Sequence, residues 1–282
     1  MRALLARARR TASLDGMTCA DQQDIDARIQ TYYGEVFDEH VRLTTRSAQG
    51  PLEFQRTQEI IRAHVPGGRV LDIGGGAGIH SRALMDAGYE VEMIDPVVRH
   101  VEQAQEAGVR ASVGDARELE HADQSFDAAI LLGPLYHLAS REDRLRALRE
   151  AARVVRAGGV VLAAGLSRYV AFGAASLGRP VPTPIPGEWA ALIADGTPGS
   201  QLRFPAGYFH TAEELEDEVA DAGLDVLEVV GVEGPAGLFL EQAGEVSAEV
   251  RDAALAIARA ASALPAIRDQ SAHLIAVAHV PA

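Results

Sequence analysis

The sequence predicts an α/β fold in which helices cover both faces of a mostly parallel sheet. Two observations carry this prediction. Apolar runs of strand length alternate with segments of helical periodicity between residues 69 and 164, and glycines follow the helical segments. Strands that alternate with helices in this way form βαβ units, whose parallel strands are covered on both faces. A chain of 282 residues is long enough for one large domain, or for one domain with a cap.

The elements follow one another in a regular order. Apolar residues recur at helical spacing between residues 21 and 64, and Pro66-Gly67-Gly68 then precedes the first strand. The predicted strands are residues 69–73, 90–94, 109–113, 126–132, 160–164, 224–232 and 273–280. The predicted helices are residues 79–87, 98–107, 142–155, 211–223 and 246–263. Thr211 and Glu214 have the spacing of a capping box at the start of one of these helices.

The chain divides into parts of different character. We expect residues 1–20 to be a disordered tail, residues 21–66 to be a helical cap and residues 67–282 to be the core domain. The alternation breaks at residues 170–206, which contain six prolines and the only tryptophan, Trp189. A long insertion with little periodicity is usually functional or disordered, so we expect a lid or substrate segment there.

Composition excludes several classes of function. The net charge of −14 disfavours nucleic-acid and anionic-membrane partners, which need a basic face. All 26 basic residues are arginines, so chemistry that forms a Schiff base on lysine is excluded. The single cysteine, Cys19, excludes a disulfide framework and a cysteine-rich zinc site, and it fits a reducing cytoplasm. The sequence has no apolar stretch of the length that a membrane span needs.

The first strand leads into a glycine-rich turn, Asp72-Ile73-Gly74-Gly75-Gly76-Ala77-Gly78. A glycine turn between a strand and a helix lets a ligand approach the backbone and the helix N-terminus. The dinucleotide fingerprint needs a glycine where Ile79 stands, and the phosphate-binding loop needs a lysine, so neither motif is present. Asp95 ends the next strand about 20 residues later, where an acid accepts hydrogen bonds from ribose hydroxyls.

Further motifs follow in a fixed order: Gly114-Asp115-Ala116, the apolar run 126–132, and Arg153-Val154-Val155-Arg156-Ala157-Gly158-Gly159. With the glycine turn and Asp95, this order resembles the class I S-adenosylmethionine-dependent methyltransferases over residues 66–168, and less closely to the C-terminus. The resemblance implies a Rossmann-like, doubly wound, seven-stranded sheet whose last strand is antiparallel. It also implies S-adenosyl-L-methionine as cofactor and S-adenosyl-L-homocysteine as its product.

The resemblance assigns roles by position. Asp72 and the glycine turn would hold the methionine part of the cofactor, Asp95 the ribose, and Asp115 the adenine. An arginine of the N-terminal helices would pair with the methionine carboxylate. The expected cofactor-binding residues are Tyr33, Arg42, Asp72, Gly74, Gly75, Gly76, Gly78, Asp95, Pro96, Gly114, Asp115, Ala116, Leu132 and Gly133.

The loop after the fourth strand, Gly133-Pro134-Leu135-Tyr136-His137, would face the reactive methyl group. It lacks the amide or acid that base-methylating members carry, and the acid that metal-dependent members carry, so we expect neither a nucleic-acid substrate nor a metal. His137 is the candidate general base, with a loop-capping or cofactor-contacting role as the alternative. Tyr136 would orient the substrate or pack against adenine. The expected substrate-binding residues are Tyr136, His137, Arg168, Trp189, Tyr208 and His210.

The sequence thus predicts in-line methyl transfer to a small molecule, with O-, N- and C-methylation and the oligomeric state left open. The composition, rich in alanine and arginine, suggests a bacterial genome of high GC content and secondary metabolism. One alternative keeps the cofactor but performs cyclisation or aminopropyl transfer, and another is a non-catalytic cofactor-binding module. A nicotinamide-dependent reductase is disfavoured because the third fingerprint glycine and a Tyr-x-x-x-Lys pair are both missing.

Overall fold

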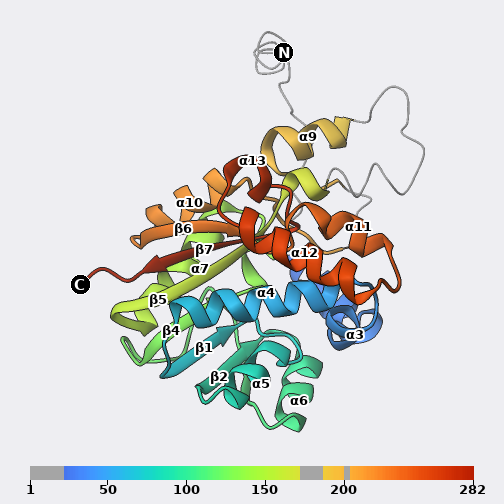
Figure 1. Ribbon diagram of the computed structural model, residues 1–282. Coiled ribbons are helices and arrows are strands. Elements are labelled where there is room, and N and C mark those ends of the chain that lie inside the picture. Colours follow the sequence, from blue (N-terminus) through green and yellow to red (C-terminus); the bar gives the residue numbers. More distant parts are fainter. Residues whose placement is uncertain (1–21, 172–186, 200–203) are drawn as a thin grey trace.

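A computed structural model describes residues 22–171, 187–199 and 204–282. Its described residues form one seven-stranded sheet in the order β3-β2-β1-β4-β5-β7-β6 (Figure 1). The strands are β1 (Arg69–Ile73), β2 (Glu90–Asp95), β3 (Arg110–Val113), β4 (Phe126–Leu131), β5 (Val155–Leu166), β6 (Asp225–Gly231) and β7 (His273–His279). Strands β1 to β5 pair in parallel, and β7 is antiparallel to both β5 and β6. The predicted fold class is confirmed.

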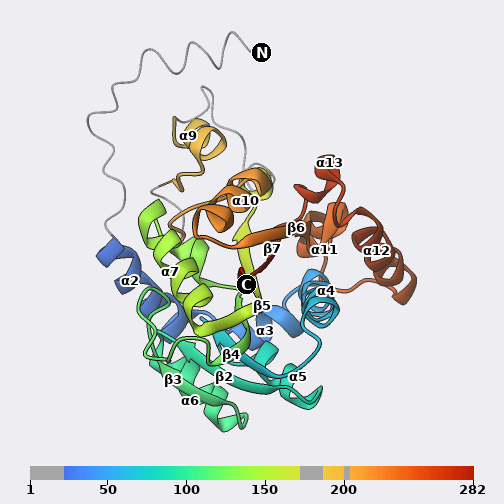
Figure 2. The same cartoon turned by 90° about the vertical axis from the view of Figure 1, so that its left-hand side faces the viewer.

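Helices cover both faces of this sheet, as Figure 2 shows from the side. Successive strand residues point to opposite faces. Leu71 accordingly packs in the cluster that includes helix α7 (Arg141–Val154) and α10 (Ala212–Asp221), whereas Val70 packs in the cluster of α4 (Gln49–His64) and α5 (Ile79–Asp86). The other helical segments are α2 (Gln22–Thr31), η1 (Tyr32–Val36), α3 (Glu39–Thr44), α6 (Val98–Glu106), η2 (Pro134–His137), α9 (Gly187–Asp195), η3 (Gly234–Ala236), α11 (Gly237–Gln242), α12 (Ala248–Ala261) and α13 (Pro265–Arg268).

Helix starts follow local sequence signals. The capping box predicted before α10 is present, because the Thr211 hydroxyl accepts the Glu214 N–H and the Glu214 carboxylate accepts the Thr211 N–H. Ser140 and Ser247 cap α7 and α12 in the simpler way, each accepting one backbone N–H. In the part of the chain that the structure describes, no helix has both the length and the apolar character needed to cross a membrane.

Three segments differ from the prediction. Strand β5 begins at Val155 rather than at residue 160, because its pairing with β4 continues across a register shift and absorbs the turn glycine Gly158. The segment between β6 and α12 folds into η3 and α11, where no helix was predicted. Within the predicted insertion 170–206, residues 187–195 form α9, while 172–186 and 200–203 lie outside the described residues, as does the predicted tail 1–20.

Candidate active site

A cavity of about 350 Å³ opens at one edge of the sheet. The carboxyl ends of parallel strands share an edge, so residues that follow β1, β2, β3 and β4 meet there. Gly74, Asp95, Gly114 and Gly133 accordingly all line the cavity. Because β7 is antiparallel, it is its amino end that reaches the same edge, and His273 joins the lining.

The glycine turn forms the floor of the cavity. Gly74, Gly76 and Gly78 all have positive φ, of 72°, 58° and 77°, which explains why glycine recurs at alternate positions. The Gly74 N–H donates to the Ile94 carbonyl, so the turn is fastened to β2. Gly78 begins α5 against α6, where an added Cβ would stand 2.8 Å from the Cβ of Ala104.

Asp72 is a buried carboxyl at the end of β1. Its Oδ2 accepts a 2.6 Å hydrogen bond from the Ser81 hydroxyl, whereas Oδ1 has no partner among the described residues. Burial raises the pKa of Asp72 to about 7. A buried polar atom without a partner is rare in a folded protein, and here it belongs to a residue of the cavity lining. The site therefore offers an unused acceptor to a ligand that carries an N–H or O–H donor.

Two further carboxylates lie at strand ends. Asp95 accepts the Gly76 N–H through Oδ2 at 2.9 Å and the Val97 N–H through Oδ1 at 2.9 Å, and His100 lies 3.1 Å from Oδ1. Asp115 is paired with Arg117. Burial opposes ionisation of Asp115, but Arg117 outweighs it and lowers the pKa. Both carboxylates are thus held in fixed positions at the cavity.

The loop after β4 brings His137 and Tyr136 to the cavity on η2. His137 Nδ1 lies 2.7 Å from the Pro205 carbonyl, which can only accept, so Nδ1 carries the hydrogen. Nε2 is then the acceptor for the Tyr33 hydroxyl at 3.2 Å. Burial lowers the pKa of His137 to about 4 and raises that of Tyr136, so both are neutral near pH 7.

The N-terminal helices contribute Arg42, which lines the cavity from α3. Its guanidinium pairs with Glu39 at 2.7 Å and with Glu53 at 2.6 Å. Pro96, Ala116 and Leu132 also belong to the lining, as do Gly75 and Gly76. Of the predicted cofactor-binding residues, Gly78 alone stands behind the lining, where it packs against α6.

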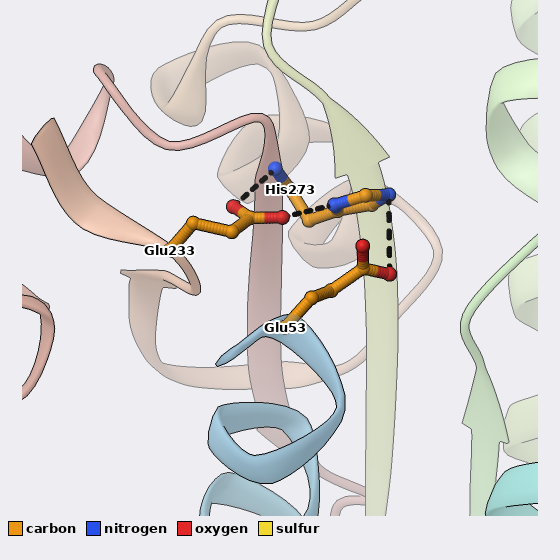
Figure 3. A group of neighbouring side chains, drawn as sticks. All are labelled: Glu53, Glu233 and His273. Atoms are coloured by element: carbon orange, nitrogen blue, oxygen red, sulfur yellow. Dashed lines mark hydrogen bonds and ion pairs between the residues drawn. The ribbon is translucent and has the colours of Figure 1, made fainter. Parts of the chain in front are cut away.

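Sequence reasoning missed a cluster of Glu53, Glu233 and His273 (Figure 3). Glu233 is fully buried, and its carboxylate accepts the His273 backbone N–H at 3.0 Å and contacts His273 Nδ1. His273 Nε2 lies 3.8 Å from Glu53. The ligand atoms of the three residues lie within 4.8 Å of one another, near enough for a metal ion, but Arg42 and the Glu233–His273 contact already occupy them. The antiparallel course expected for the last strand was the one signal that could have placed His273 at this edge.

Four predicted substrate-binding residues lie away from this cavity. Arg168, Tyr208 and His210 form a separate cluster beneath α10, in which Arg168 pairs with Glu214 and His210 with Glu218. Trp189 lies on α9 and does not belong to the cavity lining. None of these four residues lines the cavity at the strand ends, so their role in substrate binding stays a prediction.

Comparison with known proteins places these features in a family. Residues 71–163 match the family described as "Methyltransferase domain". The ubiquinone biosynthesis O-methyltransferase of Azorhizobium caulinodans is 27% identical over 223 residues, which cover 73% of this chain and 82% of that protein. The glycine/sarcosine N-methyltransferase of Aphanothece halophytica is 35% identical over 102 residues, which cover 33% of this chain and 38% of that enzyme.

Solved structures share the fold over nearly the whole chain. A possible histamine N-methyltransferase from Thermotoga maritima has a TM-score of 0.58 at 20% identity, covering 90% of this chain and 98% of that one. The 1,6-didemethyltoxoflavin-N1-methyltransferase of Burkholderia thailandensis, solved with S-adenosylhomocysteine, has a TM-score of 0.57 at 15% identity, covering 95% of this chain and 93% of that one. The matched domain runs from β1 into β5 and so contains the glycine turn and the strand-end acids. Residues 71–163 are therefore a methyltransferase domain, and the chain has the fold of S-adenosylmethionine-dependent methyltransferases.

Proposed function

We propose that the cavity at the sheet edge binds S-adenosylmethionine and that the enzyme transfers its methyl group to a small-molecule acceptor. The observation that carries this proposal is the unused Oδ1 of Asp72, buried beside a glycine turn at the end of β1. The neighbouring strand ends supply Asp95 and Asp115, so the three strand-end carboxylates line one cavity. A ligand with several donor groups along its length suits this arrangement.

The residues present fit the cofactor. Asp72 would accept from the amino group of the methionine part, and Arg42 would share its guanidinium between Glu39, Glu53 and the methionine carboxylate. Asp95 would accept from the ribose hydroxyls, and Asp115 and Ala116 would contact the adenine. When bound, the cofactor supplies an electrophilic methyl group on a sulfonium sulfur. The protein needs to add mainly orientation of the acceptor and exclusion of water.

We propose that His137 takes up the proton that the methyl-accepting substrate loses. It is neutral near pH 7, and its accepting atom, Nε2, faces the Tyr33 hydroxyl at 3.2 Å. Tyr33 lines the cavity, so it can take the proton of the acceptor while its own hydroxyl proton passes to Nε2. Tyr136 packs against the His137 ring with centroids 4.8 Å apart and fixes its orientation.

Two findings support a small acceptor. The chain carries a net charge of −14, which repels nucleic acid. The ubiquinone biosynthesis O-methyltransferase described above is matched over 82% of its length. We therefore favour O-methylation, with N-methylation as the alternative.

A second candidate is cyclisation with retention of the methyl group. The [4+2]-cyclase SpnF shares the fold with a TM-score of 0.51 at 22% identity, covering 80% of this chain and 81% of that one. A cyclase of this fold therefore exists, although cofactor-binding residues alone do not separate the two reactions. Mass spectrometry separates them, because methylation converts the cofactor to S-adenosylhomocysteine and cyclisation leaves it unchanged.

Isothermal titration of the purified full chain with S-adenosylmethionine and S-adenosylhomocysteine tests the proposal. We expect both to bind with dissociation constants between about 1 µM and 1 mM, the range typical of enzyme substrates. Absence of binding would exclude the proposed function. Binding without turnover over a broad panel of phenols and amines would favour a non-catalytic binding module.

A further inference from the structure

A second cavity, of about 320 Å³, lies beside the first. Tyr33, Glu39, Arg42, Tyr136 and His273 line both cavities and so form their common wall. None of the strand-end glycines and acids that would hold the cofactor belongs to the lining of the second cavity. A ligand in this cavity would therefore lie next to a ligand in the first, with these five side chains beside both.

Several aromatic rings line the second cavity. They come from Tyr32, Tyr33, Phe37, Tyr136, Phe204 and Phe209. Tyr32 stacks on Phe37 with ring centroids 5.0 Å apart, and Phe204 meets the edge of Tyr32 at 6.1 Å. Rings presented as faces and edges bind a flat aromatic ligand by stacking and edge contacts.

His273 supplies a hydrogen-bond donor at the common wall. Glu233 accepts the backbone N–H of His273 and contacts its Nδ1, and these contacts orient the ring. Figure 3 shows His273 between Glu233 and Glu53. Nε2 lies 3.8 Å from Glu53, beyond hydrogen-bonding distance. Burial and the nearby charge of Arg42 both lower the pKa of His273. The carboxylates of Glu53 and Glu233 outweigh these effects and raise the pKa to about 9. At neutral pH, Nε2 therefore carries a hydrogen with no close acceptor in the cluster.

We propose that the second cavity is the acceptor site, that its acceptor is a flat aromatic molecule bearing a hydroxyl group, and that His273 Nε2 donates a hydrogen bond to that oxygen. An N–H donor with positive charge attracts a hydroxyl or phenolate oxygen and repels an ammonium group, which favours a phenol over an amine. This inference rests on the proposed function, because it takes the first cavity as the cofactor site. His273 is thereby a binding and positioning residue, and the proton-accepting role stays with His137.

The location of the site is tested with 2-naphthol as the probe, titrated into the full chain saturated with S-adenosylhomocysteine. Leu238 lines the second cavity from α11, so Leu238→Trp fills it and is expected to weaken 2-naphthol binding about 10-fold or more. Phe239→Trp is the matched control, because the next side chain along α11 is 64% exposed and outside the lining. Phe37→Ala removes one aromatic ring from the lining and is also expected to weaken 2-naphthol binding. Equal affinity in all variants would overturn the assignment of this cavity.

The role of His273 is tested through the ionisation of the bound probe, since 2-naphthol and its anion absorb at different wavelengths. His273→Gln keeps a hydrogen-bond donor but loses the charge, and we expect the bound probe to ionise about one pH unit or more higher than in the wild type. His279→Gln, at the other end of β7, is the control and is expected to match the wild type. An unchanged ionisation of the bound probe in His273→Gln would contradict the hydrogen bond, whereas a purely structural role would change affinity alone.

The outcomes separate this inference from the proposed function. If the wild type binds S-adenosylhomocysteine but not 2-naphthol, the acceptor site is wrong and the cofactor site stands. If S-adenosylhomocysteine does not bind, the proposed function itself fails. Preferential binding of 2-naphthylammonium over 2-naphthol would also overturn the inference, because it would assign the cavity to amines.

Discussion

At the scale of single residues, Asp95 has two tasks. The sequence placed it as a ribose acceptor, and the structure adds that its carboxylate accepts the backbone N–H groups of Gly76 and Val97. One side chain therefore ties the glycine turn to the end of β2 and lines the cavity. Neither backbone contact was readable from the sequence, because the spacing of residues does not specify which N–H faces a carboxylate.

Asp95→Asn is expected to weaken S-adenosylhomocysteine binding about 10- to 100-fold. The amide replaces one carboxylate oxygen by an NH2 group, which cannot accept a hydrogen bond from a backbone N–H or from a ribose hydroxyl. A loss of about 1.4 kcal/mol lowers the affinity tenfold. Isothermal titration measures the change. Asp86→Asn, an exposed acid on α5, is the control and should bind like the wild type. Wild-type affinity of Asp95→Asn would remove Asp95 from the site.

His137→Gln is expected to lower the rate constant for methyl transfer about 10²- to 10⁴-fold while S-adenosylhomocysteine affinity changes little. Glutamine keeps hydrogen-bonding groups near Tyr33 and Pro205 but takes up no proton. Single-turnover kinetics with an accepted substrate measures the rate, and titration measures the affinity. Wild-type turnover would demote His137 to a loop-holding residue.

Buried histidines also predict how stability depends on pH. Burial lowers the pKa of His137 and of His80 to about 4, against about 6.5 in the unfolded chain. As pH falls from about 6.5 to 4, the unfolded state binds protons that the native state does not, so the free energy of unfolding decreases. Urea denaturation across this range should show the decrease, and His137→Gln should flatten part of it. An identical slope in the variant would show that His137 does not contribute.

At the scale of elements, the helices α7 and α10 are joined by a buried ion pair. Arg144 on α7 donates to Glu218 on α10 at 2.7 Å and stands over the Tyr208 ring at 3.8 Å, while His210 lies 3.3 Å from the same carboxylate. Tyr208 and His210, which the sequence predicts near the substrate, thus contact side chains of α7 and α10, and their role in substrate binding stays a prediction. The sequence showed their proximity to the capped helix, but it could not show that α7 brings an arginine to them.

Glu218→Ala is expected to destabilise the fold by about 3–5 kcal/mol, because Arg144 would be left buried without its partner. Chemical denaturation measures the change. Asp221→Asn is the matched control on the same helix, since its pair with Arg141 is exposed and is worth about 1 kcal/mol or less. Equal effects of the two substitutions would contradict the importance of the buried pair.

The helical cap illustrates what periodicity leaves undecided. The apolar spacing predicted helix between residues 21 and 64, and α2, α3 and α4 confirm it. Between α2 and α3, however, the chain turns through the π-helical segment η1, from which Tyr32 and Tyr33 both reach the second cavity. Regular helical spacing does not bring adjacent side chains to one site, so this pair required tertiary packing.

At the scale of the whole molecule, β7 joins β6 to the rest of the sheet. It lies between β5 and β6 and pairs with both. Without β7, β6 would therefore form no hydrogen bonds with the rest of the sheet. Its first residue, His273, also closes the wall between the two cavities. The end of the chain is therefore required for both the fold and the candidate acceptor site.

Removal of residues 273–282 is expected to abolish cooperative unfolding, since it exposes the apolar strand partners and deletes the buried side chains of β7. Circular dichroism during heating measures this. A chain lacking only Pro281 and Ala282, which lie beyond β7, is the control and should unfold like the wild type. A cooperative transition in the longer deletion would show that β5 and β6 reorganise without β7.

The sequence alone determined the α/β class and the succession of strands and helices along the chain. It also determined the glycine turn and the acids at the ends of β1, β2 and β3. These follow from local patterns, because parallel strands bring their carboxyl ends to one edge whatever the details of packing. Tertiary structure alone decided which side chains surround His273, which lines both cavities. Glu53, Glu233 and His273 come from α4, the residues after β6, and β7, and only the antiparallel insertion of β7 between β5 and β6 brings them together. Contacts between residues so distant in the chain depend on how the elements pack, which leaves no local signal in the sequence.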